Sequence, residues 1–203
     1  MDRSSGLKTA SSDTIPALFA RQAAACKDKP LFYVKRGGRY APISWEQAAA
    51  DVDALSAFLV DRQVDAGARV LLLSENRPEW SIADLAIQSV GAWTVPVYPS
   101  LTASDVLTIC RDCQPAVCIA STTEQMGKLV TVKAQVSSIR AILLMEDASV
   151  PEASCVRWTE ALARGREVAA RLRGLLEHRR QQLLPEHTAT LIYTSGTTGD
   201  PKG

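Results

Sequence analysis

Hydrophobic positions along the chain alternate between the spacing of a helix and the short unbroken runs of a buried strand. Helical spacing comes first, directly after Thr14, at Ile15, Leu18, Phe19 and Ala23. Two short apolar runs, 31–35 and 39–43, then flank a Gly-Gly pair and predict a hairpin. The first residues, 1–13, are polar and rich in Ser, so we expect a disordered tail there.

A long second helix is predicted after the hairpin. Ser44 and Gln47 have the spacing of a capping box, in which the two residues satisfy the first free amides of a helix. Apolar side chains then form one helical stripe at Trp45, Ala48, Ala49, Val52, Leu55, Phe58 and Leu59. Gly67 is typical of the end of such a unit.

Strand and helix patterns alternate from residue 69 onward. Strands are expected at 69–74, 93–98, 116–120, 141–145 and 188–193, and helices at 78–91, 102–113, 122–136 and 158–184. The run 69–74 is apolar nearly throughout, as in a strand that is buried on both faces of a parallel sheet. The pattern therefore predicts an α/β fold with a mostly parallel sheet flanked by helices.

Charge and hydropathy exclude several classes of protein. The chain has 23 Lys and Arg against 22 Asp and Glu, a net charge of +1, so we expect no nucleic-acid partner. Its apolar stretches are far shorter than the about 20 residues that span a bilayer, so no transmembrane segment is predicted. The first residues also lack the apolar core of a secretory signal, so export is not indicated.

The cysteines predict a reducing compartment, and hence a cytoplasmic protein. Five are scattered through the chain, an odd number in a protein too large to need disulfides: Cys26, Cys110, Cys113, Cys118 and Cys155. Cys110 and Cys113 have the CxxC spacing of metal and redox sites. Because no second pair follows, we interpret them as part of a helix rather than as such a site.

The helix expected at 158–184 has a basic polar face, formed by Arg164, Arg166, Arg171, Arg173, Arg179 and Arg180. Three glutamates, Glu160, Glu167 and Glu177, dilute this charge. A solvated helix that covers the sheet is therefore favoured over a contact with a membrane surface. The two histidines, His178 and His187, have no nucleophile or carboxylate at an informative spacing, so we expect structural or exposed roles.

Hydroxyls, glycines and a lysine gather after the last expected strand, at Thr194, Ser195, Gly196, Thr197, Thr198, Gly199 and Lys202. Glycines let backbone amides converge on one point, hydroxyls add hydrogen bonds, and the ammonium group adds positive charge, so the segment predicts a phosphate-binding loop. Hydroxyls can also reach Mg²⁺. An ordinary surface turn is disfavoured. A Walker A loop is disfavoured too, because Pro201 precedes the lysine and Gly203 follows it.

The run from Tyr193 to Gly203 resembles the signature loop of the adenylate-forming superfamily of acyl-CoA synthetases, luciferases and peptide-synthetase adenylation domains. Two earlier segments, 74–80 and 91–102, are similar to the long-chain fatty acid synthetase branch. Aryl and peptide-synthetase relatives more often have Asn-Pro at the Tyr-Pro pair 98–99. The resemblance runs from Ile15 to the end, which implies a partial AMP-binding domain over 14–203.

This resemblance implies an enzyme that joins a fatty acid to the α-phosphate of ATP and then transfers the acyl group to coenzyme A. Its cofactors would be ATP, Mg²⁺ and coenzyme A. Lys202 would be catalytic, and Thr194 would lie nearest the metal. The implied nucleotide-binding residues are Thr194, Ser195, Gly196, Thr197, Thr198, Gly199, Lys202 and Gly203. A lipid substrate also makes peripheral contact with the cytoplasmic face of a membrane an expectation.

In that superfamily the acyl tunnel, the adenine contacts and a late catalytic lysine follow the loop. The chain is therefore expected to be an N-terminal fragment, inactive alone and binding ATP more weakly than about 1 mM. A phosphate loop also normally leans on the helix that follows it. Two alternatives stay open: an aryl- or amino-acid-adenylating relative, and a noncatalytic truncated nucleotide-binding module.

Overall fold

A computed structural model of the chain describes residues 13–194 and 202–203. Its elements, in chain order, are α1 (Ile15–Cys26), β1 (Pro30–Arg36), β2 (Arg39–Ser44), α2 (Trp45–Asp61), β3 (Arg69–Leu73), α3 (Pro78–Ser89), β4 (Trp93–Val97), α4 (Ala103–Cys113), β5 (Val117–Ala120), α5 (Thr123–Lys133), β6 (Ala141–Leu144), β7 (Cys155–Arg157) and α6 (Trp158–Gln181).

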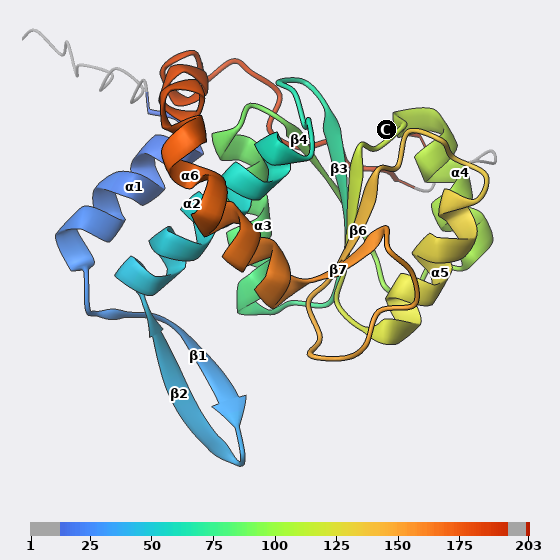
Figure 1. Ribbon diagram of the computed structural model, residues 1–203, viewed down its shortest axis with the longest axis horizontal. Helices are drawn as coiled ribbons and strands as arrows, with labels where there is room; N and C mark the ends of the chain where they lie inside the picture. Colours follow the sequence, from blue (N-terminus) through green and yellow to red (C-terminus); the bar gives the residue numbers. More distant parts are fainter. Residues whose placement is uncertain (1–12, 195–201) are drawn as a thin grey trace, which may run out of the picture.

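Five parallel strands form the central sheet, in the order β4-β3-β5-β6-β7. Residue Leu71 of β3 pairs with Val95 of β4 on one side and with Cys118 of β5 on the other. Strands β1 and β2 form a separate antiparallel hairpin that projects from the molecule between α1 and α2 (Figure 1). The prediction of an α/β fold with a mostly parallel sheet is thus confirmed.

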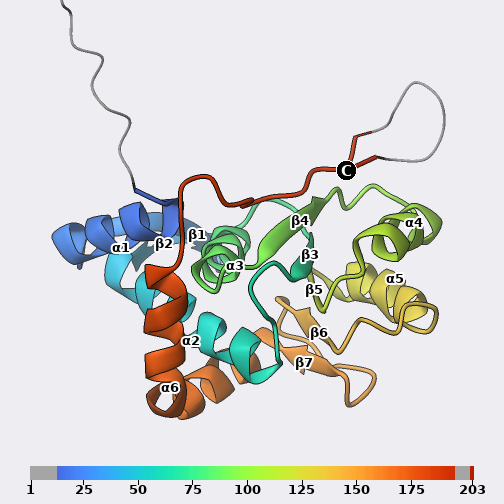
Figure 2. The ribbon, with the colours of Figure 1, turned by 90° about the horizontal axis from the view of Figure 1, so that it is seen from above.

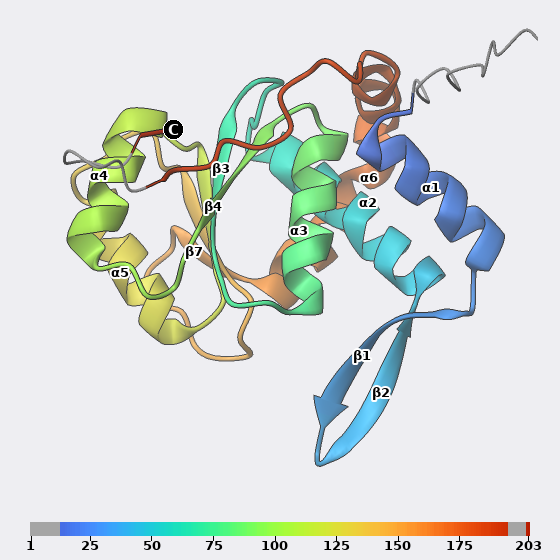
Figure 3. The same cartoon turned by 180° about the vertical axis from the view of Figure 1, so that it is seen from behind.

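Helices cover both faces of the sheet because inner strands such as β3 are apolar on both sides. Val70 and Leu72 of β3 face the layer that contains α2, α3 and α6, whereas Leu71 and Leu73 face α4 and α5. Helix α1 lies outside α2, away from the sheet (Figures 1 and 3). The fold therefore has two hydrophobic cores, one on each face, and each is sealed by its own helices.

The helices start at or within one residue of where the sequence predicted them. Ser44 and Gln47 form the expected capping box of α2, with hydrogen bonds of 3.1 and 2.9 Å. Thr102 and Asp105 form a second box at the start of α4. Three predicted ends were too late, since α3 stops at Ser89, α5 at Lys133 and α6 at Gln181.

Two strand predictions need correction. The short strand β7 was not predicted, because its three residues carry no alternating or apolar run of useful length. Conversely, the prediction of a strand at 188–193 is wrong. The segment makes only an isolated parallel bridge between Thr190 and Thr94, since it lies at the edge of the sheet and departs from β4 after that point.

Helix α6 packs chiefly against α2. A Cβ atom placed on Gly165 would lie 1.8 Å from the carbonyl oxygen of Ala54, so the two backbones approach closely there. The basic face of α6 meets the acidic residues of α2 and of the turn after it. Five of its arginines form ion pairs, joining Arg166 to Asp51, Arg180 to Asp53, Arg164 and Arg171 to Asp61, and Arg179 to Asp65.

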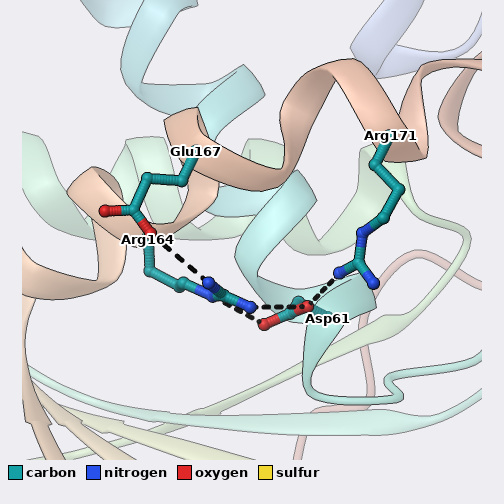
Figure 4. Close-up of polar contacts among 4 residues, drawn as sticks. All are labelled: Asp61, Arg164, Glu167 and Arg171. Carbon is teal, nitrogen blue, oxygen red and sulfur yellow. Dashed lines mark hydrogen bonds and ion pairs between the residues drawn. The ribbon is translucent and has the colours of Figure 1, made fainter.

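Asp61 is the centre of this network (Figure 4). Its carboxylate lies 3.1 Å from Nε of Arg164 and 2.7 Å from Nη2 of Arg171. Burial alone would raise the pKa of Asp61, but the hydrogen bonds and charges of the two arginines outweigh it and lower the pKa. Most of the positive charge on the basic face predicted for this helix is therefore paired with aspartates of α2 and the turn after it.

The CxxC cysteines lie in the core between the sheet and α4. Cys110, Cys113 and Cys118 are all buried, and all five cysteines of the chain are free. Burial raises the pKa of Cys113 to about 12, so its thiol stays protonated and unreactive at neutral pH. Within residues 13–194 and 202–203, no helix is long and apolar enough to cross a membrane.

Candidate functional site

The base of the predicted phosphate loop is closed by two backbone hydrogen bonds. The amide of Thr194 donates to the carbonyl oxygen of Lys202 at 3.1 Å, and the amide of Lys202 donates back to Thr194 at 3.2 Å. The structure thus brings together three of the predicted site residues, Thr194, Lys202 and Gly203. The other five, Ser195, Gly196, Thr197, Thr198 and Gly199, lie outside the described residues.

The segment that leads to the loop is held on the edge of the sheet by β4. Thr94 donates its amide to the carbonyl of Ala189 at 3.0 Å and accepts from the amide of Leu191 at 2.9 Å. Figure 2 shows this segment leaving α6 and passing over β4 toward α4. The loop base therefore lies beyond the edge strand β4, on the side of the sheet that α4 and α5 cover.

The partly buried carboxylate of Asp84 supports Thr94. The Thr94 hydroxyl donates to Oδ1 of Asp84 at 2.6 Å, and Nε2 of Gln88 donates to Oδ2 of the same carboxylate at 2.9 Å. Thr94 is fully buried, and both partners come from α3. The carboxylate thereby fixes the strand against which the loop-bearing segment pairs.

Tyr193 joins the loop base to α4. Its hydroxyl donates to Oδ2 of Asp112, near the end of that helix, and its ring packs beside the core of α4 and α5. Burial, and then this hydrogen bond, raise the pKa of Tyr193 well above its usual value, so the hydroxyl keeps its proton. A Cβ on Gly203 would lie 2.8 Å from Cζ of the ring, so only glycine fits there without displacement.

The described part of the site offers a cationic side chain and a hydroxyl group. Lys202 is exposed, so its ammonium group is free to meet a charged ligand. Thr194 supplies a hydroxyl oxygen, a hard donor of the kind that Mg²⁺ accepts beside its retained waters. In the described ranges, no three acidic, His or Cys side chains are grouped as a metal site.

The histidines lie away from the loop base. His178 is exposed on α6, and His187 accepts a hydrogen bond at Nδ1 from the amide of Leu184 at 3.4 Å, in the turn after that helix. The exposed or structural roles expected for them are thus consistent with where they lie. Sequence reasoning missed Asp84, Thr94 and Asp112, because each acts through a partner distant in the chain and belongs to no local motif.

The sequence of the chain matches a known protein family. The family model described as "AMP-binding enzyme" matches residues 19–203. The long-chain-fatty-acid–CoA ligase FadD15 of Mycobacterium bovis is 36% identical over 82% of this chain, which covers 26% of that protein. The peroxisomal long chain acyl-CoA synthetase 7 of Arabidopsis thaliana is 30% identical over 82% of this chain, which covers 24% of that protein.

Solved structures share the fold at lower identity. The A-PCP didomain of carboxylic acid reductase from Segniliparus rugosus, in complex with AMP, matches with a TM-score of 0.73 and 20% identity, over 96% of this chain and 32% of that one. The anthranilate CoA ligase AuaEII matches with a TM-score of 0.71 and 18% identity, over 94% and 34%. The chain thus spans about a quarter to a third of these proteins. It belongs to the AMP-binding enzyme family.

Proposed function

We propose that this chain is the part of an ATP-dependent acyl-CoA synthetase that holds the phosphates of ATP while a fatty acid is activated. One observation carries the proposal. The backbone pair between Thr194 and Lys202 closes the base of the signature loop, and the side chain of Lys202 is exposed to solvent. A closed base lets a glycine- and hydroxyl-rich segment present its amides together to one anion.

The residues divide the work by charge. When a carboxylate attacks the α-phosphate of ATP, negative charge grows on the departing pyrophosphate, and the ammonium group of Lys202 would neutralise it. The hydroxyl of Thr194 would provide an oxygen ligand for Mg²⁺, which would stabilise the same charge. The remaining loop positions, Ser195 to Gly199, would add amide and hydroxyl donors. Coenzyme A would then take the acyl group from the adenylate.

A fatty acid is the substrate that the relatives favour. The curated relatives that match at 36% and 30% identity are named as long-chain acyl-CoA ligases. The similarity to the anthranilate ligase is 18% and concerns the fold alone. Segments 74–80 and 91–102, which resemble the fatty acid branch, lie at the start of α3 and across β4 into the turn before α4.

Pyrophosphate exchange in the intact enzyme tests the proposal. Changing Lys202 to Ala should slow fatty-acid-dependent exchange into ATP by about 10²-fold to 10³-fold, because one charge-stabilising group is lost. The matched control is Lys35→Ala, which removes an exposed lysine of the hairpin and should leave the rate unchanged. Equal rates in wild type and Lys202→Ala would contradict the assignment.

The same assay separates the alternatives. Exchange that depends on fatty acids supports the proposed substrate, whereas exchange with aryl or amino acids alone would overturn it. Binding of MgATP without exchange on any acid would indicate a noncatalytic nucleotide-binding module. For this chain on its own we expect affinity for ATP weaker than about 1 mM and no activity, which calorimetric titration can measure.

Peripheral contact with a membrane remains a prediction from the lipid substrate. The ion pairs of α6 weigh against that helix as the contact surface, because five of its six arginines already pair with aspartates of α2 and the turn after it. A cytoplasmic location also remains a prediction, and the five free thiols support it.

A further inference from the structure

The loop base has few attachments to the body of the protein. Backbone pairing with β4 ends at Leu191, and the next residue, Ile192, is 61% exposed. The two bonds between Thr194 and Lys202 hold the ends of the loop together but do not fix the base relative to the sheet. Among the described residues, Tyr193 joins the base to α4, through the packing of its ring beside the core and through its hydrogen bond to Asp112.

Tyr193 contacts both sides of the base at once. Through its backbone it directly precedes Thr194, and its ring lies against Gly203, which directly follows Lys202. Movement of the ring would therefore shift both ends of the loop together. Because the phenol hydroxyl is held by Asp112, the orientation of the ring depends on α4.

The position of Asp112 supports a role beyond helix formation. It is the next-to-last residue of α4, where the negative end of the helix dipole repels a carboxylate and so destabilises the helix. Aspartate also has a lower helix propensity than most residues. A residue that is unfavourable locally and contacts the loop base is better explained by that contact.

We propose that Asp112 is a positioning residue for the phosphate loop, acting through the hydroxyl of Tyr193 to fix where Lys202 stands. This inference rests on the proposed function for its effect on ATP, but the physical link itself does not. Loss of the link would let the Thr194–Lys202 pair open more often and shift relative to the sheet. Such a shift weakens use of ATP because binding and stabilisation of the departing phosphates depend on placement.

Two variants remove the link with little risk to folding. Tyr193→Phe keeps the ring on Gly203 and removes only the hydroxyl. Asp112→Ala removes the acceptor and favours the helix, so a loosened loop base could not be assigned to unwinding of α4. The control is Tyr40→Phe, which removes the hydroxyl of a tyrosine that is 71% exposed on the hairpin.

Amide hydrogen exchange tests the physical link. In this chain, the Thr194 and Lys202 amides should exchange about three- to tenfold faster in either variant and unchanged in Tyr40→Phe. The double variant should match the single ones, because both remove the same interaction. Unchanged exchange in Tyr193→Phe and Asp112→Ala would overturn the inference.

Kinetics of the intact enzyme test the positioning role. The KM for ATP should rise about tenfold in both variants while the KM for the fatty acid stays the same, a split that general destabilisation would not produce. Faster amide exchange with an unchanged KM for ATP would overturn positioning and leave the proposed function intact. A wild-type enzyme that does not use ATP would instead overturn the proposed function, with the exchange result still readable.

Discussion

The contact between α2 and α6 and the base of the proposed phosphate loop are held in opposite ways. The helix pair combines a close backbone approach at Gly165, a buried core and five arginine ion pairs. The loop base relies on one tyrosine, one bridge and the pairing with Thr94. Changes in the first region should therefore cost stability, and changes in the second should cost function, as is common where loops act on a rigid scaffold.

The largest effect on stability is expected at Gly165. A Cβ there would lie 1.8 Å from the backbone oxygen of Ala54, so Gly165→Ala must force the two helices apart. We expect a loss of about 3 kcal/mol in the free energy of unfolding, measured by chemical denaturation. In the same helix, Gly174 has no atom within 4 Å of an added Cβ, so Gly174→Ala should stabilise by about 0.5–1 kcal/mol. Equal effects of the two changes would contradict the close approach.

A medium effect is expected where scaffold and loop segment meet. Thr94→Val keeps the shape of the side chain but removes the hydroxyl that donates to the Asp84 carboxylate. Leaving that partly buried carboxylate one hydrogen bond short should lower the free energy of unfolding by about 2 kcal/mol. The control is Thr108→Val on α4, whose hydroxyl bonds only its own helix, with an expected change under about 0.5 kcal/mol.

A smaller, pH-dependent effect is expected at Asp61. Its pKa is lowered in the folded protein, so its contribution is present above the unfolded pKa of about 4 and is lost as the pH falls through the folded value. Asp61→Asn should therefore lower the free energy of unfolding by about 1 kcal/mol at neutral pH and low salt. The difference from wild type should shrink on acidification.

A more exposed neighbour provides the control for that change. Asp53 has a 64% exposed side chain and pairs with Arg180 alone, so Asp53→Asn should cost under about 0.5 kcal/mol. The account is contradicted if the free energies of unfolding of wild type and Asp61→Asn differ by the same amount at neutral and acidic pH. The ion pairs of Asp61 would then not stabilise the helix contact.

Local sequence signals predicted much of the fold. The capping box at Ser44 and the apolar run of β3 predicted the helix and the strand they belong to, because those interactions are local. Strand order could not be predicted, since pairing joins residues distant in the chain. The strand β7 has too few residues to give a pattern, and the run at 188–193 has strand composition without a full strand partner.

The candidate site could also be predicted only in part. Its motif could be recognised, because Thr194, Lys202 and Gly203 lie close together in the sequence. The parts that hold it were not, because Asp112 reaches Tyr193 across 81 residues. The partners of the α6 arginines were missed for the same reason, since the charges were visible but the facing aspartates of α2 were not assigned to them.

Labelling of Lys202 tests the central claim, that the loop closed at Thr194 and Lys202 holds the phosphates of ATP. Acetylation of lysines in the intact enzyme would be followed by mass spectrometry with and without MgATP, with Lys35 as the internal control. The account predicts that MgATP slows acetylation of Lys202 severalfold and leaves Lys35 unchanged. Equal rates at Lys202 with and without saturating MgATP would contradict it.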